Sequence, residues 1–299
     1  MTPEPPAATD LPAAARLGVL GWPVAHSRSP AMQNAALEAL GLTGWRYQLL
    51  PVPPVAFAET VRGLGAAGFL GANVTIPHKE AALALATSAT PRATAIGASN
   101  TLTFNAASGA IHADNTDAPG FIAALPQPPA PGSTALVLGA GGSARAIVHA
   151  LREHDVEVEV WNRTRERAAA LVRDLGGQAV DRARPAALLV NCTAAGLEHP
   201  SSVFEGLPLT ADELSTYATV VDLVYRPGGT EFLAAARSRG CDVVDGLQML
   251  VHQGALSLEA WTGLPAPADV MLAAAHRSSI PPTHELRTSP SATRRSPRD

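Results

Sequence analysis

The sequence predicts an α/β protein with two α/β domains, the second of the Rossmann-like, nucleotide-binding kind. Three observations carry this prediction. Segments of strand type alternate with segments of helical spacing in both halves of the chain, a run of prolines divides the halves at residues 126–132, and a glycine-rich loop follows an apolar strand in the second half. A length of 299 residues is enough for two domains that each bury a core.

In the first half, strands alternate with helices. Pro30 opens a helix whose apolar residues keep helical spacing up to Gly41, and Pro77 suits the first turn of a later helix. This alternation predicts a largely parallel sheet covered by helices. The expected elements are strands at residues 16–21, 45–50 and 69–75, helices at 30–41, before about 67 and after 77, short turn-rich strands near 97–101 and 111–116, and a helix to 125 capped by residues 115–117.

Four prolines in the seven residues 126–132 can continue neither a helix nor a central strand, so this segment is a linker. We expect one domain over residues 16–125, joined again by 247–276, and a second over 126–246. Residues 277–299, rich in Ser, Pro, Thr and Arg, are expected to be a disordered tail. The second domain is expected to contain strands at 134–138, 157–161, 187–191, 219–224 and 242–244, a helix that follows the glycine-rich loop at 139–144 and runs to about 154, and a helix at 164–175. Helices from 246 and at 268–275 are expected to follow.

Composition and charge place the chain among ordinary globular proteins. Hydrophobic residues make up 46% and charged residues 16%, and a net charge of −4 gives no basic surface for nucleic acid. No apolar run is long enough to span a membrane, and residues 1–15 lack the basic and apolar regions of a signal peptide. Cys192 and Cys241 are too few for a disulfide framework or a metal cluster. We expect a cytoplasmic protein, monomeric or homodimeric, with buried thiols, no metal and a flexible N-terminus over residues 1–15.

The glycine loop follows the apolar strand at 134–138 and opens a helix, which is the context that the dinucleotide-binding fingerprint requires. Its first glycine allows a tight turn, its second lets the backbone approach a pyrophosphate, and a small third residue lets helix and strand pack closely. A tight structural turn has a similar pattern, but the place after a buried strand favours a nucleotide. The residues expected to hold it are Gly139, Ala140, Gly141, Gly142, Ser143 and Ala144.

The end of the next strand indicates which nucleotide is bound. An NAD-selective site usually has an acid there, to bind the ribose 2′-hydroxyl. Here the strand at 157–161 is followed by Asn162-Arg163-Thr164-Arg165-Glu166-Arg167, with no acid at its tip and three arginines close together. Guanidinium groups suit a 2′-phosphate, whereas the alternative, a solvated helix start, is disfavoured for cations by the helix dipole. The pattern predicts NADP.

Lys79 is the only lysine among 22 basic residues. An amine can exchange a proton where arginine stays charged, so a single lysine near a strand-to-helix junction is a candidate for proton transfer. The survival of one surface lysine in an arginine-rich chain is the alternative.

Taken together, the motifs of the chain resemble those of the shikimate dehydrogenase family. The matches run in order from about residue 18 to 264. They are Gly21-x-Pro23-x-x-His26-Ser27-x-Ser29-Pro30 with Asn34, Asn73-Val74-Thr75-x-Pro77-x-Lys79, Gly97-Ala98-x-Asn100-Thr101, Asn115-Thr116-Asp117-x-x-Gly120, the glycine loop, Asn162-Arg163-Thr164 with Arg167, Asp222-x-Val224-Tyr225, and Gly246-x-x-Met249-Leu250-Val251-x-Gln253.

The resemblance implies a nucleotide domain, a discontinuous substrate domain and a cleft between them. It implies that Lys79 and Asp117 are the catalytic pair, and that Ser27 and Ser29, with Tyr225 nearby, bind a substrate carboxylate. It implies that the ring hydroxyls of the substrate are bound by Thr75, Lys79, Asn100, Asp117 and Gln253. It also implies that the cofactor is bound by Asn162, Arg163, Thr164, Arg167 and Gly246, in addition to the glycine loop.

Each of these residues, taken singly, also fits an ordinary role in a turn, a cap or a half-buried surface. Asp117 alone reads best as a first-turn helix acid, and the two serines suit a turn before Pro30. The chain also departs from the family at Gln33, where histidine is common, and at residues 191–196, Asn-Cys-Thr-Ala-Ala-Gly, where Asn-Ala-Thr-Ser-x-Gly is usual.

The expected function is reversible NADPH-dependent reduction of 3-dehydroshikimate to shikimate, in aromatic amino acid biosynthesis. The alternatives are a quinate/shikimate or aminoshikimate-type dehydrogenase and, in another class, a non-catalytic NADP-binding regulator. Hydride transfer to a ketone requires one proton at the same oxygen, which an amine beside a carboxylate can supply or accept.

Overall fold

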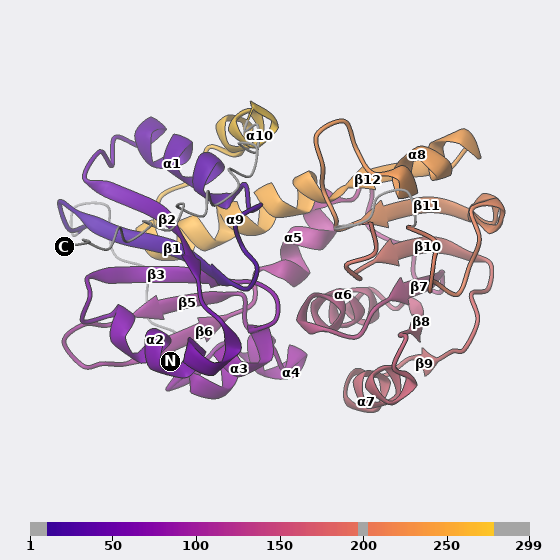
Figure 1. Ribbon diagram of the computed structural model, residues 1–299, viewed down its shortest axis with the longest axis horizontal. Helices are drawn as coiled ribbons and strands as arrows, with labels where there is room; N and C mark the ends of the chain where they lie inside the picture. Colours follow the sequence, from indigo (N-terminus) through magenta and orange to yellow (C-terminus); the bar gives the residue numbers. More distant parts are fainter. Residues whose placement is uncertain (1–10, 197–202, 278–299) are drawn as a thin grey trace, which may run out of the picture.

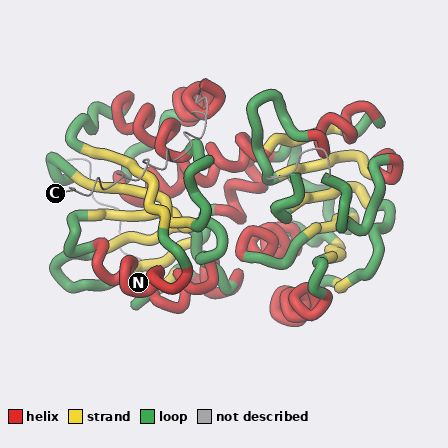
Figure 2. Tube along the Cα trace, viewed as in Figure 1, coloured by secondary structure: helices red, strands yellow, loops and turns green. Residues whose placement is uncertain are grey.

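The computed structural model describes residues 11–196 and 203–277, which form two six-stranded sheets with helices packed around them (Figure 1). Strands occupy the centre of each half and helices the outside (Figure 2). The predictions for residues 1–10 and for the tail after residue 277 lie outside the described residues. Within the described part of the chain, no helix is long and apolar enough to cross a membrane.

The first sheet has the strand order β2-β1-β3-β5-β6-β4, with β1 at Ala15–Gly21, β2 at Trp45–Pro51, β3 at Phe69–Val74, β4 at Ser88–Ala89, β5 at Thr101–Phe104 and β6 at Ile111–Asp114. Strands β2, β1 and β3 are parallel, as predicted. The parallel arrangement ends at β5, in the region where the sequence pattern changes to short, turn-rich strands, and β5 is antiparallel to β3 and β6. A short loop joins β5 to β6, and such a connection permits only an antiparallel pair.

The helices of the first half include α1 at Ser29–Ala39, η2 at Pro54–Ala56, α2 at Phe57–Leu64 and α3 at Lys79–Leu85. Pro77 is not in the first turn of α3 as expected, because the helix begins two residues later. An unpredicted helix, α4, covers Pro91–Ile96 and is capped by the Thr90 side chain. Gly97, in the left-handed region with φ 73°, ends α4, so the strand expected from residue 97 begins only at Thr101.

Helix α5 at Asp117–Ala124 is capped where the sequence indicated, by the Asn115 side chain, which accepts hydrogen bonds from the backbone N–H groups of Asp117 and Ala118 at 3.1 and 3.3 Å.

The second sheet is entirely parallel and has the order β12-β11-β10-β7-β8-β9. The strand order reverses between β7 and β10, which is where open α/β sheets bind ligands at their carboxyl ends. Its strands are β7 at Thr134–Leu138, β8 at Glu157–Trp161, β9 at Gln178–Ala179, β10 at Ala186–Asn191, β11 at Tyr217–Asp222 and β12 at Asp242–Asp245, and its helices are α6 at Gly142–Glu153, α7 at Arg165–Leu175, η4 at Asp212–Thr216 and α8 at Glu231–Ser238.

Helix α9 at Gly246–Thr262 leaves β12 and returns to the first sheet, where Trp261 Nε1 donates a hydrogen bond to the Leu102 carbonyl at 3.1 Å (Figure 1). Its crossing with α5 is close, because a Cβ added to Gly120 would lie 2.7 Å from the Gln253 backbone nitrogen. Helix α10 at Ala268–Arg277 then packs against α1. The C-terminal helices therefore complete the core of the first sheet.

Candidate active site

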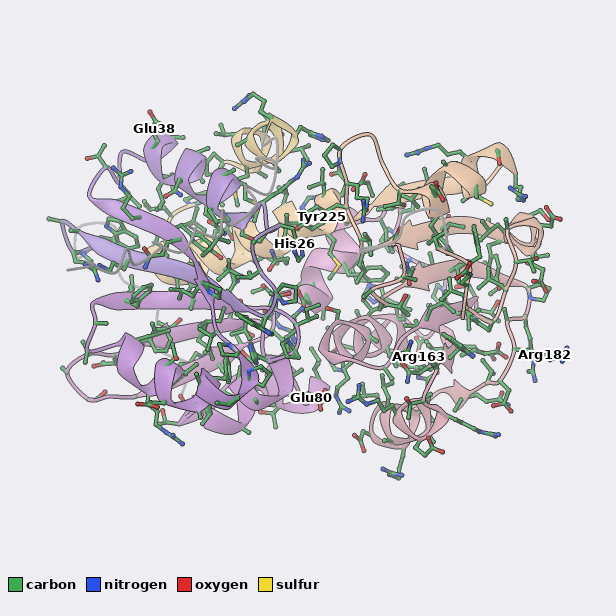
Figure 3. All side chains as sticks on the ribbon, in the orientation of Figure 1. His26, Glu38, Glu80, Arg163, Arg182 and Tyr225 are labelled. Atoms are coloured by element: carbon green, nitrogen blue, oxygen red, sulfur yellow. The ribbon has the colours of Figure 1, made fainter. Side chains whose placement is uncertain are left out.

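One cavity between the two sheets is lined by residues from both halves of the chain. All eight of the predicted substrate-contacting side chains face it: Ser27, Ser29, Thr75, Lys79, Asn100, Asp117, Tyr225 and Gln253. They come from sequence positions more than 200 residues apart: the loop before α1 and the start of that helix, the carboxyl ends of β3 and β11, the residue before β5, and α3, α5 and α9. Figure 3 shows Tyr225 and His26 in the region between the two halves.

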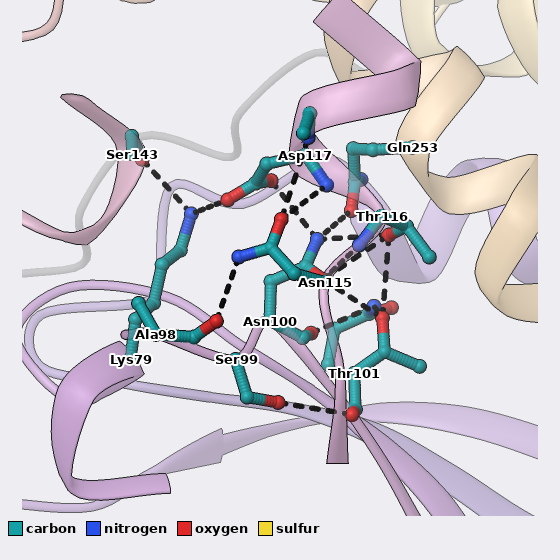
Figure 4. A network of polar contacts seen from close by, with 12 residues as sticks. Lys79, Ala98, Ser99, Asn100, Thr101, Asn115, Thr116, Asp117, Ser143 and Gln253 are labelled. Carbon is teal, nitrogen blue, oxygen red and sulfur yellow. Dashed lines mark hydrogen bonds and ion pairs between the residues drawn. The ribbon is translucent and has the colours of Figure 1, made fainter. Parts of the chain in front are cut away.

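Lys79 and Asp117 form an ion pair at the floor of this cavity, with Nζ 2.5 Å from Oδ2. Each is the first residue of a helix, Lys79 of α3 and Asp117 of α5. Their side chains are only 9% and 5% exposed, so the pair is largely shielded from water. Lys79 Nζ also donates to Ser143 Oγ at 2.9 Å, across the cavity (Figure 4). A shielded amine and carboxylate in contact can pass a proton to a bound alcohol or ketone oxygen.

Asn100 holds the other oxygen of the carboxylate. Its Nδ2 donates to Asp117 Oδ1 at 2.9 Å and to Gln253 Oε1 at 3.0 Å (Figure 4). Its Oδ1 accepts from the Thr116 backbone N–H at 2.7 Å and from Thr101 Oγ1 at 3.0 Å. The amide is thereby fixed with Nδ2 toward Asp117 and Gln253.

A buried layer of polar side chains lies beneath Asn100, and sequence reasoning missed most of it. Ser257 Oγ, fully buried on α9, accepts from Asn73 Nδ2 at 2.8 Å and hydrogen-bonds with Thr101 Oγ1 at 2.8 Å and Thr116 Oγ1 at 3.1 Å. Tyr47, also missed, donates from its hydroxyl to Asn73 Oδ1 at 2.7 Å. One signal was available for Ser257, since it lies four residues after Gln253 and so on the same helix face.

The opposite end of the cavity carries the two serines and Tyr225. Ser29 is buried at the start of α1, whereas Arg28, between the serines, points away and donates to the Ala275 carbonyl of α10 at 2.5 Å. Burial raises the pKa of Tyr225, and hydrogen bonds from the Arg28 backbone and Ser27 oppose that rise. Burial, followed by the charge of Arg226, lowers the pKa of His26, so this cavity-lining histidine is neutral at neutral pH. Neutral hydroxyl donors there can bind an anion.

The glycine loop lies at the carboxyl end of β7, beside the point where the strand order reverses. Gly139 has φ 110°, and a Cβ there would come within 3.2 Å of the Cys192 backbone, so the turn favours glycine. A Cβ at Gly141 would meet nothing within 4 Å, and no side chain caps the first turn of α6. Free N–H groups and open space suit a phosphate. Of the predicted nucleotide residues, Ser143 and Gly246 also line the cavity.

The cluster after β8 lies next to this loop, because the Gly139 N–H donates to the Trp161 carbonyl at 2.7 Å. Arg165 pairs with Asp181 at 3.1 Å. Arg163 and Arg167 are exposed and form no ion pair with any described residue. Asn162 Nδ2 donates to the Thr164 carbonyl at 2.8 Å, which closes the turn into α7. The exposed guanidinium groups suit an anionic group carried by a nucleotide.

The segment that departs from the family motif forms part of the cavity wall, through Cys192, Thr193 and Ala194. Burial raises the pKa of the Cys192 thiol, so the cysteine is protonated rather than nucleophilic. Cys241 is buried, as expected, whereas Cys192 is only half-buried. In residues 11–196 and 203–277, no group of three His, Cys, Asp or Glu side chains is placed to hold a metal ion.

Behind this wall, Asp222 at the end of β11 is fully buried and accepts from Asn191 Nδ2 at 2.9 Å and Thr230 Oγ1 at 2.7 Å. Burial raises its pKa from 3.8 to about 6, against the lowering effect of these hydrogen bonds. The folded protein therefore binds this proton more tightly than the unfolded chain does. The resulting stabilisation is fully present below the unfolded pKa and is lost as pH rises through about 6.

The second sheet is parallel and carries a glycine-rich loop of the phosphate-binding kind where its strand order reverses. Across the cavity from this loop lies the shielded lysine–aspartate pair. This combination is typical of two-domain oxidoreductases that use a nicotinamide nucleotide. Family models match three segments: the shikimate dehydrogenase substrate binding domain over residues 19–102, shikimate / quinate 5-dehydrogenase over 126–192, and the shikimate 5'-dehydrogenase C-terminal domain over 246–276. The chain belongs to the shikimate dehydrogenase family.

Individual relatives agree with this assignment. The shikimate dehydrogenase (NADP(+)) of Paracoccus denitrificans is 49% identical over 260 residues, which cover 82% of this chain and 90% of the relative. That of one strain of Thermus thermophilus is 48% identical over 266 residues, or 88% and 98% of the two chains. The crystal structure of the enzyme from another Thermus thermophilus strain, in complex with NADP(H) and shikimate, superimposes with a TM-score of 0.78 at 46% identity, covering 88% and 99%. The Aquifex aeolicus enzyme gives 0.79 at 32% identity, covering 87% and 97%.

Proposed function

We propose that this chain is an NADP-dependent shikimate dehydrogenase, which reversibly reduces 3-dehydroshikimate to shikimate in aromatic amino acid biosynthesis. The observation that carries the proposal is the lysine–aspartate pair at 2.5 Å, in the wall of a cavity that also reaches the glycine loop. The chain retains both halves of that pair, which argues against a non-catalytic NADP-binding regulator. The enzyme is proposed to be cytoplasmic and a monomer or homodimer.

The loop and the arginine cluster fit the dinucleotide. Gly141 leaves room for a pyrophosphate, α6 presents uncapped N–H groups, and the tip of β8 carries arginines instead of an acid. When bound, NADPH supplies the hydride for the carbonyl carbon of the substrate. The residues proposed to hold it are Gly139, Ala140, Gly141, Gly142, Ser143, Ala144, Asn162, Arg163, Thr164, Arg167 and Gly246.

The substrate is proposed to lie between the serine end of the cavity and the ion pair. Ser27, Ser29 and Tyr225 bind its carboxylate with neutral donors, which avoids a second full charge near the pair. Thr75, Asn100 and Gln253 bind ring hydroxyls. These contacts place the reacting oxygen beside Lys79 and Asp117.

Lys79 and Asp117 handle the proton at that oxygen. In the reductive direction the ammonium donates a proton as the carbonyl becomes an alcohol, and in the oxidative direction the pair accepts it. Asn100 holds Asp117 Oδ1 while Oδ2 stays on the amine, so the carboxylate keeps one orientation through the cycle. The narrow, buried position excludes bulk water from the exchange.

The assay that tests this proposal follows nicotinamide absorbance with purified protein, each of three substrates (shikimate, quinate or the amino analogue of shikimate), and NADP+ or NAD+. Rapid reduction with shikimate and NADP+ alone is the expected result. Comparable activity with quinate or NAD+ would instead support a quinate/shikimate dehydrogenase, and activity with an amino analogue alone would support the aminoshikimate type. No activity in any combination, with NADP+ binding intact, would contradict the enzymatic assignment and favour the regulator.

A further inference from the structure

Ser143 joins the nucleotide loop to the amine of Lys79. It is the second residue of α6, on the nucleotide side, yet its hydroxyl accepts a hydrogen bond from Lys79 Nζ at 2.9 Å (Figure 4). The same ammonium donates to Asp117 at 2.5 Å. Ser143 is therefore one of two residues that fix the direction of the amine, and the one that belongs to the other half of the molecule.

The contact is supported by close packing around it. A Cβ added to Gly142 would lie 2.6 Å from Lys79 Cβ, so the loop backbone rests directly on the lysine side chain. One turn further along α6, Arg145 Nε donates to the Ile96 carbonyl of α4 at 2.6 Å, and Arg145 Nη1 pairs with Asp174 of α7 at 3.0 Å. The start of α6 thus touches the first half at two points.

The Ser143 hydroxyl can accept one hydrogen bond and donate another, so it can connect Lys79 to a bound phosphate. While Ser143 Oγ accepts from the ammonium, its own hydrogen remains available as a donor. The adjacent helix N-terminus is the place proposed for the nucleotide pyrophosphate. A phosphate oxygen that accepts the Ser143 hydrogen would strengthen the acceptor character of Oγ and tighten its bond to Lys79, because hydrogen bonds in a chain polarise one another.

We propose that Ser143 is a positioning residue that holds the Lys79 amine and transmits to it whether the nucleotide loop is occupied. This inference rests on the proposed nucleotide site. With such a link, the Lys79 amine takes its position for proton transfer only after the nucleotide has bound. An alanine at this position would leave the loop backbone N–H groups in place and remove the hydroxyl, and with it both the contact to Lys79 and the proposed contact to the phosphate.

The Lys79 side chain can be observed by NMR without overlap from other lysines, because Lys79 is the only lysine in the sequence. Full-length protein grown with 13C,15N-lysine gives a single correlation between side-chain 13Cε and 15Nζ nuclei. Spectra are recorded for wild type and Ser143→Ala, free and with 2′-phospho-ADP-ribose, which has the pyrophosphate but no nicotinamide. Ser133→Ala is the matched control, since Ser133 lies in the same half and its side chain does not line the cavity. Calorimetry measures nucleotide binding to each protein.

We expect the free Ser143→Ala protein to have a displaced Nζ resonance. At nucleotide concentrations that saturate each protein, set from its own calorimetric affinity, the nucleotide should shift this resonance in wild type and Ser133→Ala but not in Ser143→Ala. Identical free spectra, or the same shift in Ser143→Ala, would overturn the role of Ser143 and leave the proposed function standing. A failure of wild type to bind the nucleotide would overturn the nucleotide site itself, and this inference with it.

Discussion

Ser257→Ala removes one buried hydroxyl from the polar layer beneath Asn100, which holds the proposed catalytic residue Asp117. That hydroxyl accepts from Asn73 Nδ2 at 2.8 Å, contacts Thr101 Oγ1 at 2.8 Å, and donates to the Gln253 carbonyl at 3.0 Å. After its loss, Asn73 Nδ2 keeps only longer contacts, to the Asn100 carbonyl at 3.2 Å and Thr101 Oγ1 at 3.4 Å. Thr101 can still donate to Asn100 Oδ1 at 3.0 Å. One buried donor is thus left poorly satisfied.

The loss of stability follows from this one poorly satisfied donor. A buried polar group left without a good partner costs about 1–3 kcal/mol, and we expect the free energy of unfolding to fall by that amount. Turnover should fall by roughly tenfold, or about 1.4 kcal/mol in the transition state. The reason is that Thr101 and Thr116, whose hydroxyls hydrogen-bond to Asn100, lose their contacts with Ser257. Asn100 in turn holds Asp117 Oδ1. The affinity for NADP+ should not change, since the hydroxyl lies on the substrate side.

Urea unfolding and steady-state kinetics test this prediction together. Thr262→Val is the control, because Thr262 is also fully buried on α9 and its hydroxyl donates to the Leu258 carbonyl at 2.8 Å, away from the cavity. Thr262→Val should lower stability without lowering kcat. Equal kcat losses in the two variants would show that the Ser257 effect is general destabilisation, and an unchanged kcat in Ser257→Ala would refute the positioning argument.

Three further predictions concern charge, packing and cofactor choice. Asp222→Asn should abolish one titration, so the stability of wild type relative to the variant should fall by about 2 kcal/mol as pH rises from about 4 to 7, which is most of the effect of a shift of about two pKa units. Urea unfolding at both pH values would contradict this if the difference stayed constant. Gly120→Ala should destabilise the fold by about 1–3 kcal/mol and raise the KM for shikimate, because the added Cβ would collide with α9. Gly63→Ala is the control, since a Cβ there would meet nothing within 4 Å. Equal unfolding midpoints for the two variants would disprove the clash. Arg163→Ala should weaken NADP+ binding by about 10–100-fold and spare NAD+; calorimetry showing the same loss in Arg165→Ala, whose arginine pairs with Asp181, would remove the distinction.

The parts of the fold that the sequence predicted are those with strong local signals. The strand at β7 is a continuous apolar run closed by a glycine loop, and α9 has regular apolar spacing, so both were found. Helices α4 and α8 were missed; α4 has only six residues, too few for a clear period. Helix α5, as short as α8, was predicted because residues 115–117 mark its cap. The antiparallel pairing of β5 with β6 follows from the short connection between them, whereas the pairing of β5 with β3 depends on which strands become neighbours in the sheet, which local sequence does not encode.

The candidate site divides in the same way. Lys79 and Asp117 stand in ordered motifs, and the structure brings them together although they are 38 positions apart. Tyr47 and Ser257 stand in ordinary strand and helix patterns, where a polar residue gives no sign that it is buried. Their role depends on the approach of α9 to β3 and β5, a tertiary contact that local sequence does not show. Polar networks of this kind are found only from packing.

The most direct test of the central claim compares 3-dehydroshikimate reduction by NADPH in wild type, Lys79→Met and Asp117→Asn, with nucleotide binding measured in parallel. Removing a group that transfers the proton should lower kcat by about 10²–10⁴-fold. We expect this loss of kcat in both variants, while each variant still binds NADP+. Near-normal turnover in folded Lys79→Met would contradict the account, because no other described side chain places an amine at the reacting oxygen.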